Sequence, residues 1–162
     1  MRMSKLGKEV TALTGKSSST DFLKSIGAEN IIMRDEYLEA PAKALERPLF
    51  ASAIDTVGGN VLSKMLPQIS PHGVVACCGN VAGIEVNTTV FPFILRGITL
   101  AGIDSAESPI EFKTSIWNKF ADEWKLDLSS MIKVVSKESL QQEIDLILEG
   151  GQQGRVVLQH GE

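Results

Sequence analysis

The sequence predicts an α/β fold built on a doubly wound parallel sheet. Short apolar, β-rich runs alternate along the chain with patterns typical of helices. The near-continuous apolar character of these runs indicates strands that are buried on both faces, as in parallel sheets. A length of 162 residues is enough for one domain with a substantial core.

The individual elements follow from these patterns, in chain order. Strands are expected at 9–13, 30–33, 51–55, 74–78, 98–103, 132–135 and 155–159. Helices are expected at 19–25, 39–46, 60–66 and 109–125, and a last one carries Leu140, Ile144, Ile147 and Leu148 on one face. The first six residues look like the end of a helix closed by Gly7. A sheet of this type normally opens with a strand, a Gly-rich turn and a helix, so its first strand and Gly-rich turn are missing here.

The expected helix at 109–125 carries aromatic side chains at helical spacing. Apolar residues recur every three or four positions, at Phe112, Ile116, Trp117, Phe120 and Trp124. Amphipathicity alone produces such a pattern, so it predicts a buried apolar stripe and not an aromatic ligand site.

Composition narrows the class of protein. The chain is 43% hydrophobic and 22% charged, with a net charge of −4 and no basic block, which argues against a nucleic-acid surface and favours a small-molecule partner. No signal peptide or membrane span is visible, because the most apolar stretch is interrupted by Arg96, so we expect a cytoplasmic protein that makes no membrane contact. Cys77 and Cys78 lack the spaced partners of a metal site, so we expect buried, reduced thiols and no metal.

Five sequence blocks together are specific enough to indicate a family. They are TALTGKSSSTDFLKSIGAENIIMRDE, AIDTVGG, ACCGNVAG, TTVFPFILRGITLAGIDS and GRVVLQ. In this order and spacing they resemble the medium-chain dehydrogenase/reductase superfamily. Within it the sequence is most similar to the zinc-free quinone oxidoreductase group, which includes the NADPH-dependent acrylyl-CoA reductases.

The resemblance runs from about Ser4 to the C-terminus and implies only the C-terminal half of such an enzyme. A catalytic domain and the Gly-rich turn for the cofactor pyrophosphate would precede it. The implied organisation is a truncated, Rossmann-like NADP-binding domain at 1–130. A tail at 131–162 would return to the missing catalytic domain.

The turn formed by Thr14, Gly15, Lys16 and Ser17 is the first candidate site. TGKS resembles the end of a phosphate-binding P-loop, but Val10 stands where that loop needs a glycine. In a doubly wound nucleotide-binding sheet, the loop after the second strand meets the adenosine ribose, and small polar and basic residues there accommodate the 2′-phosphate of NADPH. The alternative is a solvated lysine in a helix-capping turn.

The resemblance implies further cofactor contacts and no catalytic residue. Gly79 and Asn80 would lie near the nicotinamide, the backbone of Phe93, Ile94 and Leu95 would meet its carboxamide, and Arg155 would reach the phosphates. Each of these segments has a structural alternative: a turn, an apolar core segment or a surface arginine. The glycines of the Asp55–Gly59 turn are equally open to a ligand role or a simple turn. The catalytic residues stay unknown, because neither His72 nor His160 has a partner in a recognisable motif.

We therefore expect the cofactor-domain part of an NADPH-dependent oxidoreductase that reduces an activated C=C bond of an acrylyl-CoA or quinone-like substrate. The chain alone should be inactive. The alternative is a stand-alone nucleotide-binding or regulatory module without catalysis. Without the central first strand, either the second strand closes on the fourth in a five-stranded sheet, or two chains associate and cover the gap. Of these two outcomes we expect the homo-oligomer.

Overall fold

The computed structural model describes residues 2–160 and confirms an α/β fold with parallel strands. Its strands are β1 (Thr11–Thr14), β2 (Asn30–Met33), β3 (Phe50–Asp55), β4 (Ile69–Cys77), β5 (Thr99–Gly102), β6 (Ile132–Val135) and β7 (Arg155–Leu158). Its α-helices are α1 (Arg2–Lys5), α2 (Thr20–Ser25), α3 (Arg34–Glu39), α4 (Gly59–Met65), α5 (Phe91–Arg96), α6 (Ile110–Ala121) and α7 (Leu140–Leu148). Each predicted strand is present with bounds that shift by a few residues, and α1 ends before Gly7 as expected.

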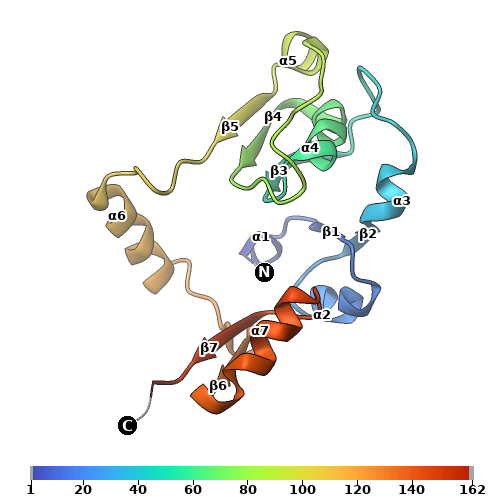
Figure 1. Cartoon of the computed structure of the whole chain (residues 1–162). Coiled ribbons are helices and arrows are strands. Elements are labelled where there is room, and N and C mark those ends of the chain that lie inside the picture. Colours follow the sequence, from blue (N-terminus) through green and yellow to red (C-terminus); the bar gives the residue numbers. More distant parts are fainter. Residues whose placement is uncertain (1, 161–162) are drawn as a thin grey trace.

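The strands form three separate parallel sheets. β1 pairs with β2, β4 lies between β3 and β5, and β6 pairs with β7 (Figure 1). Within residues 2–160, β1 and β3 do not pair with each other or with any strand on their outer edges. The closed five-stranded sheet, one of the two expected arrangements, is therefore not formed by the described residues, and a gap separates β1 from β3.

The hydrophobic core lies between α4 and the sheet of β3, β4 and β5. It consists of the buried side chains Leu62, Leu66, Ile69, Val75 and Ile98. Phe93 and Leu100 pack against it from α5 and β5. This region contains most of the buried apolar residues, so it is the best-packed part of the chain.

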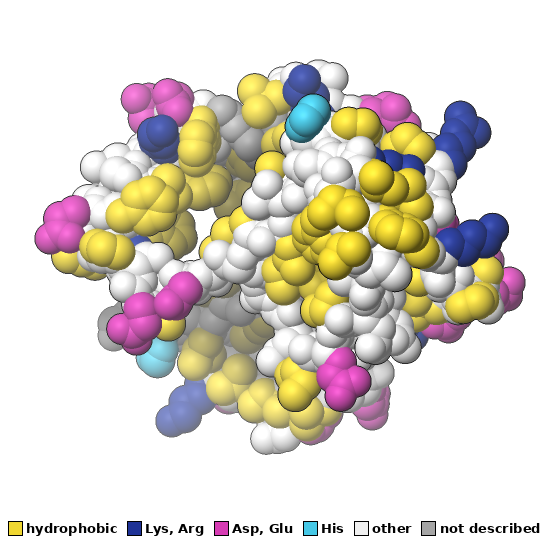
Figure 2. Space-filling view, turned by 90° about the horizontal axis from the view of Figure 1, so that it is seen from above, with side chains coloured by type: hydrophobic (Ala, Val, Ile, Leu, Met, Phe, Trp, Pro, Cys, Tyr) yellow, Lys and Arg dark blue, Asp and Glu magenta, His cyan; other side chains and the backbone are white. Residues whose placement is uncertain are grey.

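Outside that core, two burial predictions are wrong. Strand side chains are not covered on both faces, since Ile54 is 71% exposed and Val74 is also exposed. The apolar stripe of α6 is not buried either: Trp117 is 70% exposed, and Phe112 and Phe120 are exposed with it. Figure 1 shows α6 apart from the three sheets, and Figure 2 shows hydrophobic side chains spread over one face of the molecule. These surfaces are open because no other layer formed by the described residues packs against them.

The predicted helix at 39–46 is wrong as well. The helix there is α3, which ends at Glu39, and an irregular segment follows as far as β3. Polar contacts hold this segment: Lys64 Nζ donates to the Ala40 carbonyl at 2.5 Å, and Gln68 Nε2 donates to Glu46 Oε2 at 2.8 Å. Arg96 adds hydrogen bonds to the carbonyl oxygens of Glu46 and Pro67.

Tyr37 of α3 joins the same network. Its hydroxyl donates to Gln68 Oε1 at 2.7 Å, and its ring lies 5.2 Å from Lys64 Nζ. Burial, and then the charge of Glu46, raises the pKa of Tyr37, so the hydroxyl remains a donor at neutral pH. The network therefore fixes α3, and with it the β1–β2 pair, against the core.

Candidate functional site

The turn at 14–17 lies where β1 ends and α2 approaches. The backbone N–H of Lys16 donates to Thr14 Oγ1 at 3.1 Å, and a single 3₁₀ turn at Ser17–Ser19 leads into α2. The Lys16 side chain is half-buried, and its Nζ donates to the Gln152 carbonyl at 2.7 Å. Lys16 is therefore held in place and does not extend freely into solvent.

A second cation, which the sequence analysis missed, lies at this turn. Arg34 begins α3, and a Cβ atom added to Gly15 would be 3.0 Å from the guanidinium carbon of Arg34. Its Nε also pairs with Asp35 Oδ1 at 3.0 Å, and its side chain is 52% exposed. The sequence shows Arg34 only as the residue that directly follows β2. The parallel register of β1 and β2, in which Thr14 lies opposite Met33, brings it beside the turn.

These groups make a suitable site for a phosphate. Lys16 supplies an ammonium and Arg34 a guanidinium fork, which binds phosphate oxygens through two parallel donors. Thr14 and Ser17 add hydroxyls, and Gly15 keeps the space beside Arg34 free of a side chain. The donor set thus fits the 2′-phosphate of NADPH better than the ribose 2′-hydroxyl of NADH, which pairs with an acidic residue.

The glycines after β3 and β4 have a structural role. Asp55 is buried, and its carboxylate accepts the N–H of Gly58 at 3.0 Å. A Cβ at Gly58 would be 2.5 Å from the carbonyl oxygen of Gly83, and a Cβ at Gly79 would overlap the backbone of Thr56. The two loops therefore pack backbone against backbone, which explains these glycines without a ligand.

The neighbouring residues after β4 are partly accessible. Asn80 is exposed, as the nicotinamide role would require. The prediction of two buried thiols is wrong for Cys78, which is exposed, whereas Cys77 is half-buried. Burial raises the pKa of Cys77, and its hydrogen bond to Asp55 raises it further, so this thiol stays protonated.

The segment of Phe93, Ile94 and Leu95 lies in α5, a helix the sequence analysis did not predict. The backbone N–H groups of Phe93 and Ile94 already donate to the Val90 carbonyl, at 3.1 and 2.9 Å. Phe93 packs on the core, while Ile94 and Leu95 are exposed. In this conformation the segment presents apolar side chains, and not those two amides, to a ligand.

The structure brings together only part of the predicted site. One group of contacts joins the turn at 14–17 with Arg34 and with the chain at Gln152. Arg155 lies three residues after Gln152, at the exposed start of β7. Gly79, Asn80 and α5 belong to the separate sheet of β3, β4 and β5 (Figure 1). The adenosine and nicotinamide ends of the predicted site are thus carried by different sheets.

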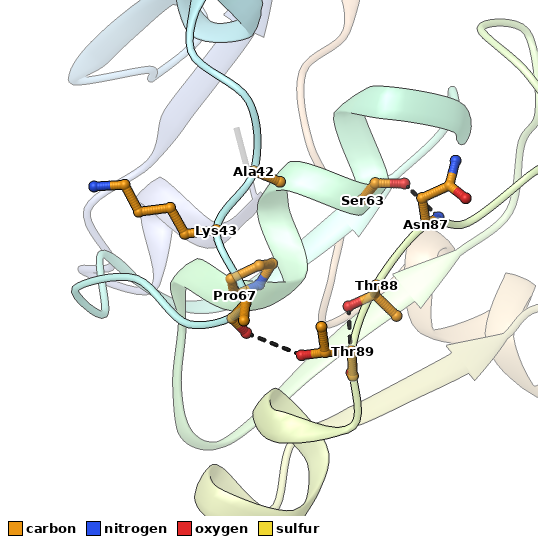
Figure 3. Close-up of a pocket in the computed structure, with 8 residues that line it drawn as sticks. Ala42, Lys43, Ser63, Pro67, Asn87, Thr88 and Thr89 are labelled. Carbon is orange, nitrogen blue, oxygen red and sulfur yellow. Dashed lines mark hydrogen bonds between the residues drawn. The ribbon is translucent and has the colours of Figure 1, made fainter.

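A shallow pocket of about 240 Å³ lies between the segments 42–44 and 87–89 and the side of α4 (Figure 3). Its hydroxyl groups are engaged within the chain. Ser63 donates to the Gly59 carbonyl and accepts the N–H of Asn87, both at 2.9 Å, and Thr89 donates to the Ala44 carbonyl. The Ser63 and Thr89 hydroxyls of this pocket thus connect neighbouring segments of the chain.

Two features are absent from the described residues 2–160. In this range no three His, Cys, Asp or Glu side chains are grouped as metal ligands would be. No helix in the same range is long and apolar enough to cross a membrane.

Comparison with known proteins identifies the family. The family model described as zinc-binding dehydrogenase matches residues 3–122. The acrylyl-CoA reductase AcuI of Ruegeria pomeroyi is 38% identical over 154 residues, which are 94% of this chain and 47% of that protein. The yhdH oxidoreductase from Salmonella enterica in complex with NADP is 36% identical, with a TM-score of 0.89 over 98% of this chain and 49% of that one. The Bacillus subtilis protein yhfP with NAD bound is also 36% identical, with a TM-score of 0.90 and the same coverage.

The chain thus spans about half the length of the relatives it matches. The match to the family model covers most of the chain, and the relatives agree with it in fold over nearly all residues. This chain belongs to the zinc-binding dehydrogenase family, within the medium-chain dehydrogenases/reductases that its sequence resembles.

Proposed function

We propose that this chain provides the adenosine 2′-phosphate part of an NADPH site in an oxidoreductase. The observation that carries the proposal is the placement of Lys16 and Arg34 at one turn, where the absence of a side chain at Gly15 lets the Arg34 guanidinium approach the backbone. The NADP-bound yhdH oxidoreductase, which has the same fold over nearly the whole chain, supports it. A cytoplasmic location remains a prediction.

The reaction we propose for the whole protein is reduction of an activated C=C bond, in an acrylyl-CoA or quinone-like substrate. The name of the Ruegeria pomeroyi relative supports this substrate class. NADPH supplies the hydride when bound, while residues of this chain hold the cofactor. Besides Lys16 and Arg34, the proposed cofactor-binding residues are Thr14, Gly15, Ser17, Gly79, Asn80, Phe93, Ile94, Leu95 and Arg155.

The isolated chain should not turn over substrate. Its sequence has no Gly-rich turn of the type that binds the cofactor pyrophosphate, and neither of its two histidines lies in a recognisable catalytic motif. The substrate class is therefore tested on a full-length protein that contains this sequence. NADPH-dependent reduction of acrylyl-CoA is expected, and activity on alcohols without activity on acrylyl-CoA would contradict the proposal.

The 2′-phosphate site is tested on the chain itself by calorimetric titration with NADPH and NADH. We expect weak binding with a preference for NADPH, and Lys16→Glu should abolish that preference, a change of about tenfold, because the new carboxylate repels the phosphate. Lys24→Glu on exposed α2 is the matched control, since it changes the net charge equally, and it should change affinity less than about twofold. Equal affinity of the unchanged chain for the two cofactors would refute the 2′-phosphate role.

We further propose that the chain forms a homo-oligomer. The outer edges of β1 and β3 have no strand partner within residues 2–160, and unpaired edges favour pairing with another chain. The tail adds apolar surface, because Val134, Leu148 and Val157 are exposed. Light scattering at several concentrations should show a dimer or larger species. A monomer at every concentration would contradict this.

A further inference from the structure

The C-terminal part of the chain reaches back to the candidate phosphate turn. The Gln152 carbonyl accepts Lys16 Nζ at 2.7 Å, and Gln153 Nε2 donates to the Ser18 carbonyl at 3.1 Å and to Ser19 Oγ at 3.0 Å. The partners are 134 to 136 residues apart in the sequence. These hydrogen bonds connect the segment between α7 and β7 with the turn after β1.

The contact restricts a side chain that is otherwise flexible. A lysine ammonium has three donors on a four-carbon stem, and ordering it costs rotamer entropy. In this chain the Gln152 carbonyl fixes the position of Lys16 Nζ and uses one donor, which leaves two for a phosphate. A neutral carbonyl also leaves the positive charge of Lys16 uncompensated.

Gln153 acts on the backbone of the same turn. Ser19 is buried, and its N–H donates to the Lys16 carbonyl at 3.1 Å, which closes the 3₁₀ turn. The Gln153 amide spans the Ser18 carbonyl and the Ser19 hydroxyl, so it fixes the conformation of the turn that carries Lys16. Conversely, a ligand that requires this conformation of the turn strengthens the contact between the turn and the C-terminal segment, because coupling between two sites is reciprocal.

We propose that Gln153, together with the backbone of Gln152, is a positioning element for recognition of the adenosine 2′-phosphate. It pre-orders Lys16 and the Ser17–Ser19 turn and so determines the selectivity for a 2′-phosphorylated nucleotide. This inference rests on the proposed function of the turn. It predicts that a residue at the far end of the chain, which need not touch the ligand, sets that selectivity.

The test compares two nucleotides that differ only by the 2′-phosphate, adenosine 2′,5′-bisphosphate and adenosine 5′-monophosphate, titrated into the full chain by NMR. The unchanged chain should prefer the bisphosphate. Gln153→Ala removes the amide and should lower that preference about threefold to tenfold, the effect expected for one or two hydrogen bonds. Gln159→Ala is the matched control, because it truncates an exposed glutamine of the same tail that lies outside these hydrogen bonds, and it should leave the preference unchanged.

The outcomes separate this inference from the proposed function. If the unchanged chain does not prefer the bisphosphate, the 2′-phosphate site itself is refuted, and the positioning role with it. If that preference exists and Gln153→Ala leaves it unchanged, only the positioning role is refuted. An increased preference would show that the C-terminal segment competes with the phosphate, which would also overturn the proposal.

Two additional measurements guard against a trivial loss of structure. Ser19→Ala removes one acceptor of the Gln153 amide and keeps the other, so it should produce a smaller loss of preference in the same direction. If Gln153→Ala does not fold, Ser19→Ala serves as the test variant instead. Amide hydrogen exchange at 17–19 should become faster in Gln153→Ala while exchange in β4 stays the same, because only the turn loses its support.

Discussion

The α4–β4 region and helix α6 have similarly apolar sequences but opposite environments. Leu66 and Ile69 are fully buried between α4 and the sheet, whereas α6 has no buried residue and Trp117 is 70% exposed. In both α4 and α6, helical periodicity places apolar side chains on one face. Whether that face is covered depends on a second element at the right place, and residues 2–160 provide one for α4 and none for α6. An exposed apolar stripe therefore indicates that no element of the described residues covers it.

The largest expected effect tests this contrast directly. Leu66→Ala should lower the free energy of unfolding by about 2 to 5 kcal/mol, because it leaves a cavity in the core. Trp117→Ala removes a larger side chain from an exposed face and should cost at most about 1 kcal/mol. Urea denaturation followed by circular dichroism measures both. Similar losses for the two variants would mean that α6 is covered in solution, for example by a second copy.

A smaller effect is expected at the packed loops after β3 and β4. Gly79→Ala should cost about 1 to 3 kcal/mol, because its Cβ would overlap the carbonyl of Thr56 and the loop must move. Gly102→Ala at the end of β5 is the control, since no other atom lies within 4 Å of its added Cβ. Equal thermal stabilities of the two variants would show that the loops are loosely packed.

The smallest effect concerns acid stability at Glu46. Burial by itself would raise the pKa of Glu46, but hydrogen bonds from Gln68 and the Lys43 N–H and the charges of Lys64 and Lys43 outweigh it, so the pKa is lowered. Because the folded pKa lies below the ordinary value of 4.5, its contribution to stability is present above about pH 4.5 and is lost as the pH falls through the folded pKa.

Glu46→Gln should therefore reduce stability at pH 7 by less than about 1 kcal/mol, since the group is partly exposed, and the difference from the unchanged chain should shrink as the pH falls below about 4.5. Denaturation midpoints at several pH values measure it. A difference that grows toward low pH would contradict the lowered pKa.

The sequence predicted the strands well because their signal is local. An apolar run bounded by turn residues identifies a strand wherever its neighbours lie, and β2 and β6 were predicted with their bounds. The predicted helix at 39–46 failed for the opposite reason. Pro41 interrupts it, and contacts from Lys64, Gln68 and Arg96 determine its conformation, which no local pattern contains.

In the candidate site, too, the local features could be predicted from the sequence and the contacts between distant residues could not. The turn at 14–17 was recognisable from its residues and its place after a strand. Arg34 was missed because its position beside Gly15 depends on the register between β1 and β2, in which Thr14 lies opposite Met33. The contact of Lys16 with Gln152 could not be predicted, because it joins residues 136 positions apart and no local pattern relates the two.

The backbone packing of the two glycine loops has a consequence for how the sheet assembles. β3 and β4 are paired so that Gly79 lies against Thr56, where no Cβ fits. If β4 slipped by one residue along β3, Cys78 or Asn80 would occupy that place, and its side chain would collide with the Thr56 backbone. A slip would also turn every strand side chain to the opposite face. The contact of Gly79 with Thr56 therefore favours the observed alignment of β3 and β4 over one shifted by a residue.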